Sequence, residues 1–448
     1  MANINTSTVA EALGRTYLRQ TFLVPFERTF ANFYSQVEDF SDGGDLRGSA
    51  RYFEIATRNS HASAITGSGT TGESATLPTF SAPASVQAAI SPVTLLASLE
   101  ISELLLAVGQ GDGLLSKMDV IDRYVKMTRE CAVSNLNRAT LGHGTGRMAV
   151  VQATTDTATT FVCRNPESVY QLRVGMLIAS YDTDATGGTV DSQAITNYRQ
   201  ITAINPETRT VTVDAAATYT IGHGIYKVGL THATAPTTEF LISTNGLRNI
   251  NDDGTLAATI YGITRSANTS LNATVIDASL GAYSEAGLRK GVDRIQQNTG
   301  LLPDAIWSNS GMVGEHLNSL TGSRVFQTTG SSSGVPAYQT GASYKGISFI
   351  GPDGSPIPFN VDRDLPNREI NIVTQRYFRR MVARPLNWIG DNVGPDGSPT
   401  PILLQTPAST TYAFSKIAGM AWIGNICHLQ PKANTRWTNL ADAMLAGD

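Results

Sequence analysis

The sequence predicts an α+β protein built from several domains. Its 448 residues are too many for one ordinary hydrophobic core. One long amphipathic helix is expected at 116–141, and the segments on either side of it are patterned like strands. A run of short strands then fills 147–245, and helical patterning returns only after it. Helix and strand therefore occupy separate stretches of the chain, as in α+β architectures.

The expected helix at 116–141 acts as a spine for this arrangement. Ser116 and Asp119 fit a capping box at its start. Three glycines in the sequence LGHGTG end its periodicity, because glycine readily adopts positive φ. One face repeats at spacings of three and four residues: Met118, Ile121, Val125, Thr128, Ala132, Leu136 and Ala139.

Composition limits what the protein does. Charged residues are 16% of the chain and the net charge is −4, so no global attraction to nucleic acid is expected. Three scattered cysteines argue against a disulfide framework. No secretory signal and no apolar run of about 18 residues is present. We therefore expect a cytoplasmic protein with no membrane partner.

The first 98 residues have two unusual segments. Residues 1–45 carry many aromatic side chains, which either dock on the body as a terminal helix or reach another subunit. Residues 46–98 predict a long hairpin with strands at 51–57 and 85–99. The tract between these strands is rich in Gly, Ser and Thr, and a loop of this length is usually functional or mobile. A separate short apolar helix or strand is expected at 100–108.

The hairpin tract contains a formal dinucleotide-binding pattern, Gly67, Gly69 and Gly72. A dinucleotide site needs these glycines to open a helix after a strand. The residues that follow, Glu73 to Pro78, do not resemble a helix start. A flexible loop tip is the favoured interpretation, and a cofactor site is the alternative.

The remaining chain divides into an inserted β-region and a mixed α/β region. Short strand-like runs at 147–245 suggest a small barrel or sandwich, with a hairpin turn at Asn205–Arg209. Helices are then expected at 277–298 and 310–320, with a buried strand at 302–309 between them. A final β-rich return covers 414–430.

Motifs for chemistry are mostly missing. The six histidines form no ligand pair with helical spacing, and no nucleophile elbow or phosphate-binding loop is present. Four carboxylates allow a metal or acid/base set, but their turn context favours solvated positions: Asp252, Asp253, Asp362 and Asp364. We expect no catalytic, cofactor-binding or metal-binding residue.

Two basic groups stand out. The larger comprises Arg376, Arg379, Arg380 and Arg384, and the smaller comprises Arg123, Lys126 and Arg129. Within an assembly they would face nucleic acid or an acidic neighbour. Ordinary ion pairing is the other interpretation.

The order of these elements resembles the major capsid proteins of tailed bacteriophages, which share the Hong Kong 97-like fold. The resemblance lies in three stretches: 137–146, which closes the spine helix; 302–309, after the second helix; and 344–349 with 361–366. It implies an N-terminal arm, an extended loop, a peripheral domain, an inserted β-barrel-like domain, an axial domain and a return into the peripheral domain. These would be 1–45, 46–98, 99–146, 147–245, 246–410 and 411–448, respectively.

The resemblance also implies a function and partners. The chain would form hexamers and pentamers of an icosahedral shell around phage double-stranded DNA, with only weak DNA contact at the inner surface. A portal and a decoration protein are expected partners. The extended loop has no Lys, so the isopeptide crosslinking of some relatives is not expected. No charged scaffolding segment precedes residue 45, so a separate scaffolding protein is implied. The protein would be found in the virion, and in host cytoplasm during assembly.

Three other interpretations also fit the sequence. The same fold serves encapsulin-like cellular compartments. A cytoplasmic enzyme would use the loop of Gly67, Gly69 and Gly72 or the carboxylates. A tail or adhesin protein would use the β-modules, although the spine helix argues against it.

Overall fold

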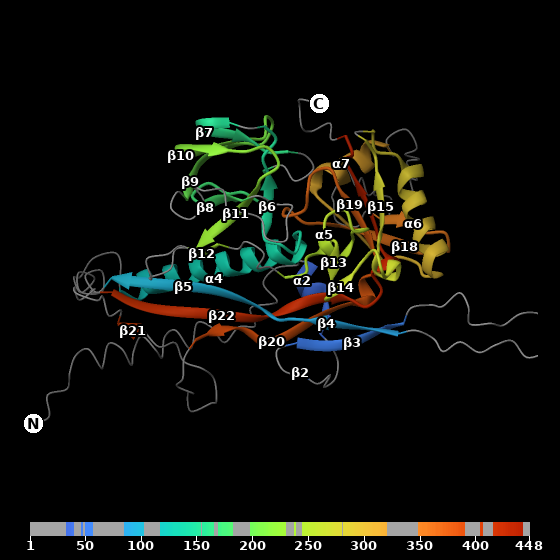
Figure 1. The fold of residues 1–448 in the computed structure, drawn as a ribbon, viewed down its shortest axis with the longest axis horizontal. Coiled ribbons are helices and arrows are strands. Elements are labelled where there is room, and N and C mark those ends of the chain that lie inside the picture. The colour runs from blue at the N-terminus through green and yellow to red at the C-terminus, as the bar shows by residue number, and fades with distance from the viewer. Residues whose placement is uncertain are drawn as a thin grey trace, which may run out of the picture.

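The computed structural model shows a long body with a barrel on one side and a hairpin on the other (Figure 1). The residues it describes are 33–39, 46–47, 50–56, 85–102, 117–153, 155–164, 169–181, 198–229, 237–238, 244–279, 281–319, 348–389, 404–405 and 415–441. All statements below about strands, contacts and sites concern these residues.

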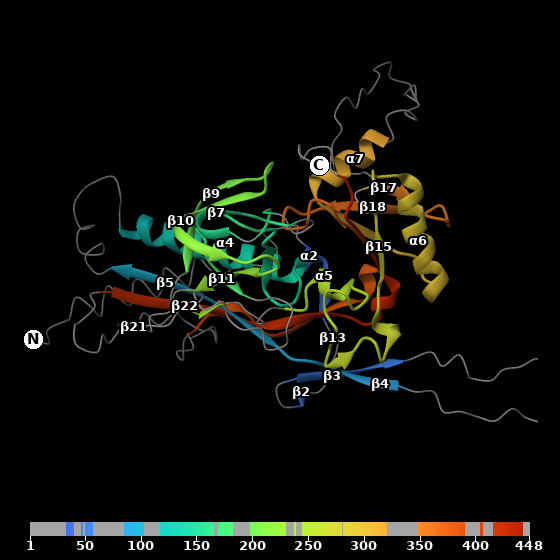
Figure 2. The same ribbon diagram turned by 45° about the horizontal axis from the view of Figure 1, so that its top comes forward.

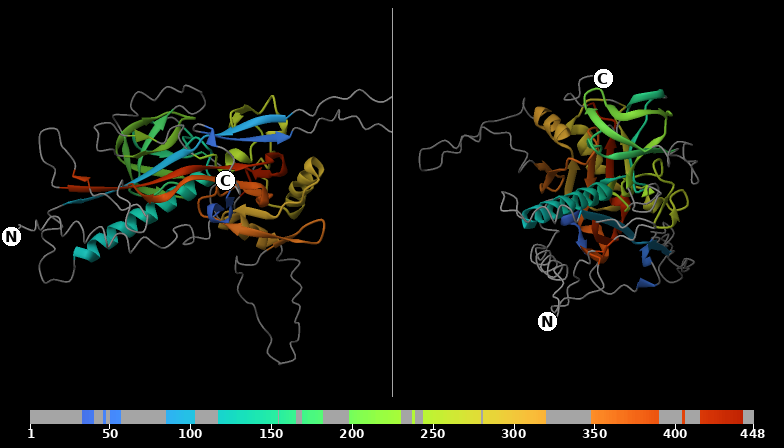
Figure 3. Two further views of the ribbon diagram at one scale, coloured as in Figure 1. Left: turned by 90° about the horizontal axis from the view of Figure 1, so that it is seen from below. Right: turned by 90° about the vertical axis from the view of Figure 1, so that its left-hand side faces the viewer.

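A long sheet and the spine helix form one half of the body. The predicted helix is confirmed as α4 (Lys117–Leu141), which packs along β5 (Val93–Ser102). β22 (Ser415–His428) pairs antiparallel with the whole of β5 and, on its other side, with β20 (Phe378–Trp388). Two short strands, β1 (Glu38–Asp39) and β21 (Leu404–Gln405), complete this sheet. Figure 3 shows α4 running beside the long strands.

The hairpin is a separate small sheet of β2 (Leu46–Arg47), β3 (Ala50–Ala56) and β4 (Ser85–Ile90). β3 and β4 pair antiparallel from Arg51↔Ile90 to Ala56↔Ser85, which confirms the predicted hairpin. The base is anchored on the body, because Ala88 and Ile90 are buried and the Ala89 N–H donates to the Tyr261 carbonyl at 3.0 Å. Figure 2 shows the other end of the pair directed away from the long sheet.

One predicted strand is wrong in extent. The run expected at 85–99 is two strands in two different sheets, β4 and β5, with Ser91 and Pro92 between them. Proline has no N–H to give to a ladder, so a strand breaks there readily. β5 also continues through Ser102. Residues 100–102 therefore belong to β5 and do not begin the separate element that was expected at 100–108.

The inserted β-region has its own sheet and its own core. Pairing runs in the order β6, β11, β8, β9, β10 and β7, with β12 beyond β11. The ring closes because Val151, just after β6, bridges Cys163, just after β7, and the Gln152 N–H donates to the Val162 carbonyl at 2.8 Å. The expected turn at Asn205–Arg209 joins β9 and β10. The strands are β6 (Arg147–Val150), β7 (Thr155–Val162), β8 (Leu177–Tyr181), β9 (Arg199–Asn205), β10 (Thr210–Tyr219), β11 (Gly224–Gly229) and β12 (Thr237–Thr238).

The other half of the body is a six-stranded sheet with two helices. Its order is β15 (Thr274–Asp277), β23 (Thr435–Thr438), β19 (Ile370–Val373), β16 (Ala305–Ser308), β18 (Pro356–Val361) and β17 (Ser348–Ile350). The helices are α6 (Glu285–Thr299) and α7 (Ser310–Ser319). α7 and the buried strand β16 confirm the predictions for 310–320 and 302–309.

This sheet is the wall between two hydrophobic cores, as side-chain alternation in β16 shows. Ile306 packs into the core with α6 and α7. Its neighbours Ala305 and Trp307 face the central core, which also holds Leu136 of α4 and Trp422 of β22. The central core therefore joins the helix, the long sheet and the six-stranded sheet into one body.

The second predicted helix begins later than expected. Asp277 ends β15, and α6 starts only at Glu285, after Ser284 accepts a hydrogen bond from the Gly287 N–H at 3.1 Å. Parallel pairing of β15 with β23 fixes residues 274–277 as strand. That pairing partner lies about 160 positions away, beyond the reach of local patterning. Smaller elements complete the body: α2 (Phe33–Gln36), α5 (Leu247–Ile250), β13 (Thr259–Ile260) and β14 (Ile263–Thr264).

Candidate functional site

The barrel leaves and rejoins the body at two touching glycines. A Cβ on Gly246 would lie 2.1 Å from the carbonyl oxygen of Gly142, so only glycine fits there. Gly144 has φ +87° and packs on the side chain of Asn249, where a Cβ would lie 2.5 Å from Nδ2. Entry and exit of the β-region are therefore adjacent, at the end of α4 and the start of α5. This geometry supports the expected insertion.

A polar junction connects α4, the barrel and the six-stranded sheet. Asn137 of α4 directs its Nδ2 at both oxygens of Asp362, each at 3.1 Å, and at Oδ2 of Asp364 at 2.9 Å. From the barrel side, Arg173 Nη2 lies 3.0 Å from Oδ1 of Asp364, and Gln171 donates to the Asp364 carbonyl at 3.0 Å. We call these five residues the polar junction. Burial raises the pKa of Asp362, and hydrogen bonds from the Asp364 N–H and Asn137 partly oppose that shift.

Asp252 is a buried turn residue whose hydrogen bonds are well supplied. Its Oδ2 accepts from the N–H groups of Gly254, Leu256 and Ala257 at 2.9 to 3.2 Å. Its Oδ1 pairs with Arg436 Nη2 at 3.0 Å, and the Arg436 side chain is itself buried. The carboxylate therefore organises the turn that follows α5 and links it to β23.

The structure corrects the expectation that the four carboxylates are solvated. Only Asp253 is exposed, whereas Asp252, Asp362 and Asp364 are 0%, 6% and 2% exposed. They do not form one metal or acid/base set, because Asp252 pairs with Arg436 while Asp362 and Asp364 meet Asn137. The sequence placed them correctly in turns but could not show that these turns lie inside the body.

A second buried ion pair joins α5 to the turn before β19. Arg248 forms a two-bond pair with Glu369, at 2.9 Å from Nε to Oε2 and 2.7 Å from Nη2 to Oε1. Thr438 donates to the same carboxylate at 3.3 Å. Both charged side chains are at most 4% exposed, so each depends on the other for compensation. Sequence analysis missed this pair because its members are 121 positions apart.

Three of the four described histidines, His143, His316 and His428, are buried. Burial lowers the pKa of His428 to about 3, and its Nδ1 accepts from the Gln430 N–H at 3.1 Å. Burial also lowers the pKa of His316, which contacts the Tyr283 hydroxyl at 2.6 Å. His143 lies in the glycine turn after α4, where burial, then Arg147, holds its pKa well below the usual value. Each is held as the neutral ring.

The larger basic group lies on β20 and the turn before it. β1 runs parallel to this part of β20, with Glu38 opposite Arg379 and Asp39 opposite Arg380 in the register. The backbone of β1 therefore lies beside the part of β20 that carries Arg379 and Arg380. Arg376 is exposed and its guanidinium lies 5.5 Å from the centre of the Tyr377 ring.

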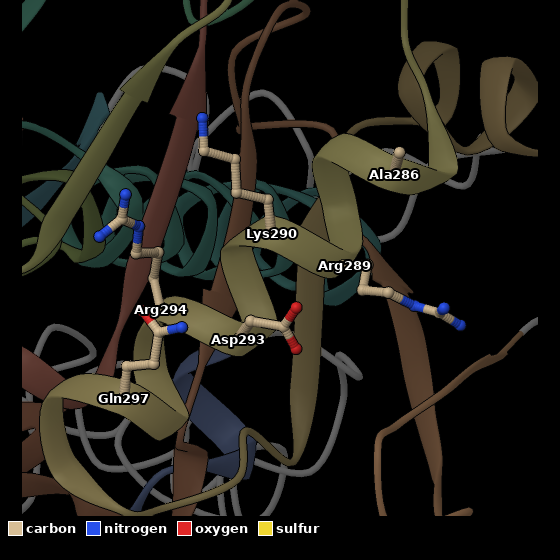
Figure 4. Close-up of a pocket in the computed structure, with 6 residues that line it drawn as sticks. All are labelled: Ala286, Arg289, Lys290, Asp293, Arg294 and Gln297. Carbon is tan, nitrogen blue, oxygen red and sulfur yellow. The ribbon is translucent and has the colours of Figure 1, made fainter.

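α6 presents a cationic outer face. A shallow hollow of about 340 Å³ is lined by Ala286, Arg289, Lys290, Asp293, Arg294 and Gln297. Figure 4 shows Lys290 and Arg294 extending to the same side of the helix and Arg289 to the other. Three cations and one carboxylate give this face a local positive charge in a chain whose net charge is −4.

The loop of Gly67, Gly69 and Gly72 lies outside the described residues. Within the described ranges, no three His, Cys, Asp or Glu side chains group closely enough to hold a metal ion. No helix among the described residues is long and apolar enough to span a membrane.

Comparison with known structures identifies the fold. The capsid asymmetric unit of cyanophage A-1(L) matches over 93% of this chain and 95% of that chain, with a TM-score of 0.51 and 8% sequence identity. The capsid of a native GTA particle matches over 92% of this chain and 91% of that chain, with a TM-score of 0.43 and 10% sequence identity. The capsid of Myoviridae phage XM1 covers 90% of both chains, with a TM-score of 0.40 and 10% identity. No family model and no curated protein matches the sequence. The cyanophage match confirms the predicted phage-capsid fold.

Proposed function

We propose that this chain is the major capsid subunit of a tailed phage and assembles into an icosahedral shell around double-stranded DNA. The observation that carries the proposal is the cyanophage A-1(L) capsid match, which extends over nearly the whole of both chains. A fold alone does not determine function, so the arrangement of the projecting parts has to agree with it.

The projecting parts agree with assembly. Among the residues that the structure describes, the β3–β4 hairpin meets the body at its base, through Ala88, Ala89 and Ile90. The long sheet ends on β5, which pairs only with β22 among the described strands and carries Leu96 with 68% of its surface exposed. An exposed strand edge and a hairpin off the body are groups that a neighbouring subunit can pair with or cover.

Such a shell is built by repeating the same contacts between many copies of one chain. Heterologous contacts that close into rings produce hexamers and pentamers from one chain. Many modest contacts acting together then give a stable shell without any single strong interface. The low net charge suits a wall that must hold DNA without gripping it, with α6 as a local cationic face for weak contact. In this proposal the chain is structural and not catalytic.

The proposed division of labour follows the expected domains. Residues 1–45 and 46–98 serve as arm and extended loop, 99–146 with 411–448 as peripheral domain, 147–245 as inserted domain and 246–410 as axial domain. The proposed partners are further copies of the chain, a separate scaffolding protein, a portal and a decoration protein. The location is the virion, after assembly in host cytoplasm.

Light scattering and negative-stain microscopy of the purified chain test the proposal. We expect ring-shaped capsomers or closed shells whose population rises with protein concentration. DNA inside particles from infected cells would separate a phage shell from a cellular compartment. A small oligomer of fixed size at every salt and protein concentration would contradict the proposal. Nucleotide binding that is lost when Gly67, Gly69 and Gly72 are changed to Ala would favour the enzyme.

A further inference from the structure

Surface arginines outside α6 make hydrogen bonds within the chain. On the barrel, Arg199 donates to the carbonyls of Ala215 and Ala216 at 3.1 and 2.9 Å. After β18, Arg363 donates to the Ser134 hydroxyl at 3.1 Å. Each of these side chains therefore has a structural role at its own position.

The three cations of α6 make no contact of this kind. Arg289, Lys290 and Arg294 are exposed, and none forms an ion pair or side-chain hydrogen bond with another residue that the structure describes. Asp293 lines the same hollow and is paired with none of them. Like charges one helical turn apart repel each other, as Lys290 and Arg294 do. An anion from outside the chain would relieve this repulsion.

α6 holds these cations on a rigid element. Its inner face includes Leu288 and Val292, both 0% exposed in the core beneath the helix. Gly291 lies so close to the sheet that a Cβ on it would be 2.5 Å from the side chain of Ile372. The backbone of the cationic face is therefore fixed relative to the six-stranded sheet, so an anion that binds there orders only side chains.

The lining of the hollow has the chemistry of a phosphate-binding surface. Figure 4 shows Lys290 and Arg294 on one side of the helix and Arg289 on the other, and all three line the hollow. Gln297 adds an amide donor, and the lining has no apolar side chain larger than that of Ala286. Protein interfaces are enriched in aromatic residues and depleted in Lys, whereas Arg, Lys and Gln are common contacts to nucleic-acid phosphates. The lining therefore favours a phosphate chain over a protein partner.

We propose that the outer face of α6 binds the phosphate backbone of double-stranded DNA. The inference rests on the proposed shell, and it names the part of the subunit that meets the enclosed DNA. Each of the three cations would contact one phosphate, and Gln297 would donate to a phosphate oxygen. Contacts to phosphates carry no base readout, so binding is independent of sequence and weakens with salt as counterions are released. Repeated in every subunit, this weak contact would order DNA along the shell wall.

Fluorescence anisotropy of labelled DNA duplexes of about 30 base pairs tests this face, with the full chain at concentrations where light scattering shows no shells. We expect two duplexes of unrelated sequence to bind equally, with an affinity that falls between about 50 and 200 mM NaCl. Changing Arg289, Lys290 and Arg294 together to Gln should reduce the slope of log affinity against log salt by about 3, at about 0.9 per phosphate contact. Asp293→Asn removes the carboxylate of the hollow and should tighten binding. Melting curves show that each variant is folded.

Two single variants separate the α6 face from the charge of the whole chain. Arg294→Gln should reduce the salt slope by about 1, whereas Arg164→Gln, at an exposed arginine just after β7, should leave the slope unchanged. Equal effects of these two variants, or an unchanged slope in the triple variant, would overturn the inference.

Assembly gives an independent measurement of the same face. A triple variant that binds DNA normally but no longer forms shells would overturn the inference, because α6 would then be a contact between copies. An unmodified chain that forms shells but does not bind DNA in 50 mM NaCl would overturn the α6 inference alone. A chain that binds DNA but forms no shells at any concentration would overturn the proposed function.

Discussion

The body and the β3–β4 hairpin differ in how extensively each packs against the rest of the chain. In the body, buried charges find partners within the same chain, as Arg248 does with Glu369 and Arg436 does with Asp252. The hairpin shares its ladder among its own strands, and no described element outside its sheet packs broadly against it. Figure 2 shows β3 and β4 as a separate strand pair below β13, at the edge of the body. Buried charges of the body are thus compensated within the chain, whereas the hairpin is the part that would meet another copy in the proposed shell.

Removing the hairpin end should have the largest effect on assembly and almost none on folding. Ala56 and Ser85 are paired in register, so replacing 57–84 with Asn-Gly closes the strands with a two-residue turn. We expect no particles by light scattering, and a melting temperature within about 2 °C of the unassembled parent. Particles of normal size from the shortened chain would show that the hairpin is not an assembly element.

Breaking a buried pair should do the reverse and damage the body. Arg248→Met leaves the Glu369 carboxylate buried without its cation, which should cost about 3–5 kcal/mol of unfolding free energy. Urea denaturation of the shortened, unassembled chain measures it. Arg363→Met, at a side chain 70% exposed, is the matched control and should cost less than about 1 kcal/mol. Equal losses in the two variants would contradict a body held by buried pairs.

A side chain added at the glycine contact where the barrel joins the body should cause the next largest loss of unfolding free energy. Gly246→Ala places a Cβ 2.1 Å from a backbone oxygen, which we expect to cost about 1–3 kcal/mol by overpacking. Gly300→Ala meets no atom within 4 Å but has φ +72°, so it should lose only about 1 kcal/mol from backbone strain. Urea denaturation of both variants measures these losses of unfolding free energy. An unchanged unfolding free energy for Gly246→Ala would mean that the two ends of the barrel separate freely.

Acid should weaken the body in a defined way. His428 has a folded pKa of about 3 against 6.5 when unfolded, so the unfolded chain binds more protons between these values. Its contribution is present above pH 6.5 and is lost as pH falls towards 3, by up to about 1.4 kcal/mol per pH unit. His428→Gln should reduce this slope in denaturation curves at pH 7, 6 and 5. Asp362 has the opposite effect on the pH dependence, because burial raises its pKa. Its folded carboxyl keeps a proton to higher pH than the unfolded one does, so its contribution to stability falls as pH rises.

The sequence was informative where one element determines its own pattern. The periods of α4 and α7 and the apolar run of β16 were sufficient to locate them, and the two hairpins followed from strand and turn signals. It failed where a distant partner decides. The start of α6 depends on the pairing of β15 with β23, and the placement of β5 in the long sheet, apart from β4, depends on its pairing with β22.

The polar junction could not be predicted for the same reason. Asn137 and Asp362 are 225 positions apart, so neither local period nor motif connects them. Turn composition suggested water around Asp362 and Asp364, because turns are usually at the surface. Here the turn after β18 lies beneath α4 and beside the barrel, and its acids are inside. A polar residue next to Leu136 on the buried end of α4 was the one available hint.

Cryo-electron microscopy of the particles formed by the purified chain tests the central claim most directly. We predict closed icosahedral shells of hexamers and pentamers, with the β3–β4 hairpin of each subunit lying against a neighbouring subunit. Particles without this symmetry, or a hairpin folded back on its own body, would contradict assembly through the projecting parts of the chain.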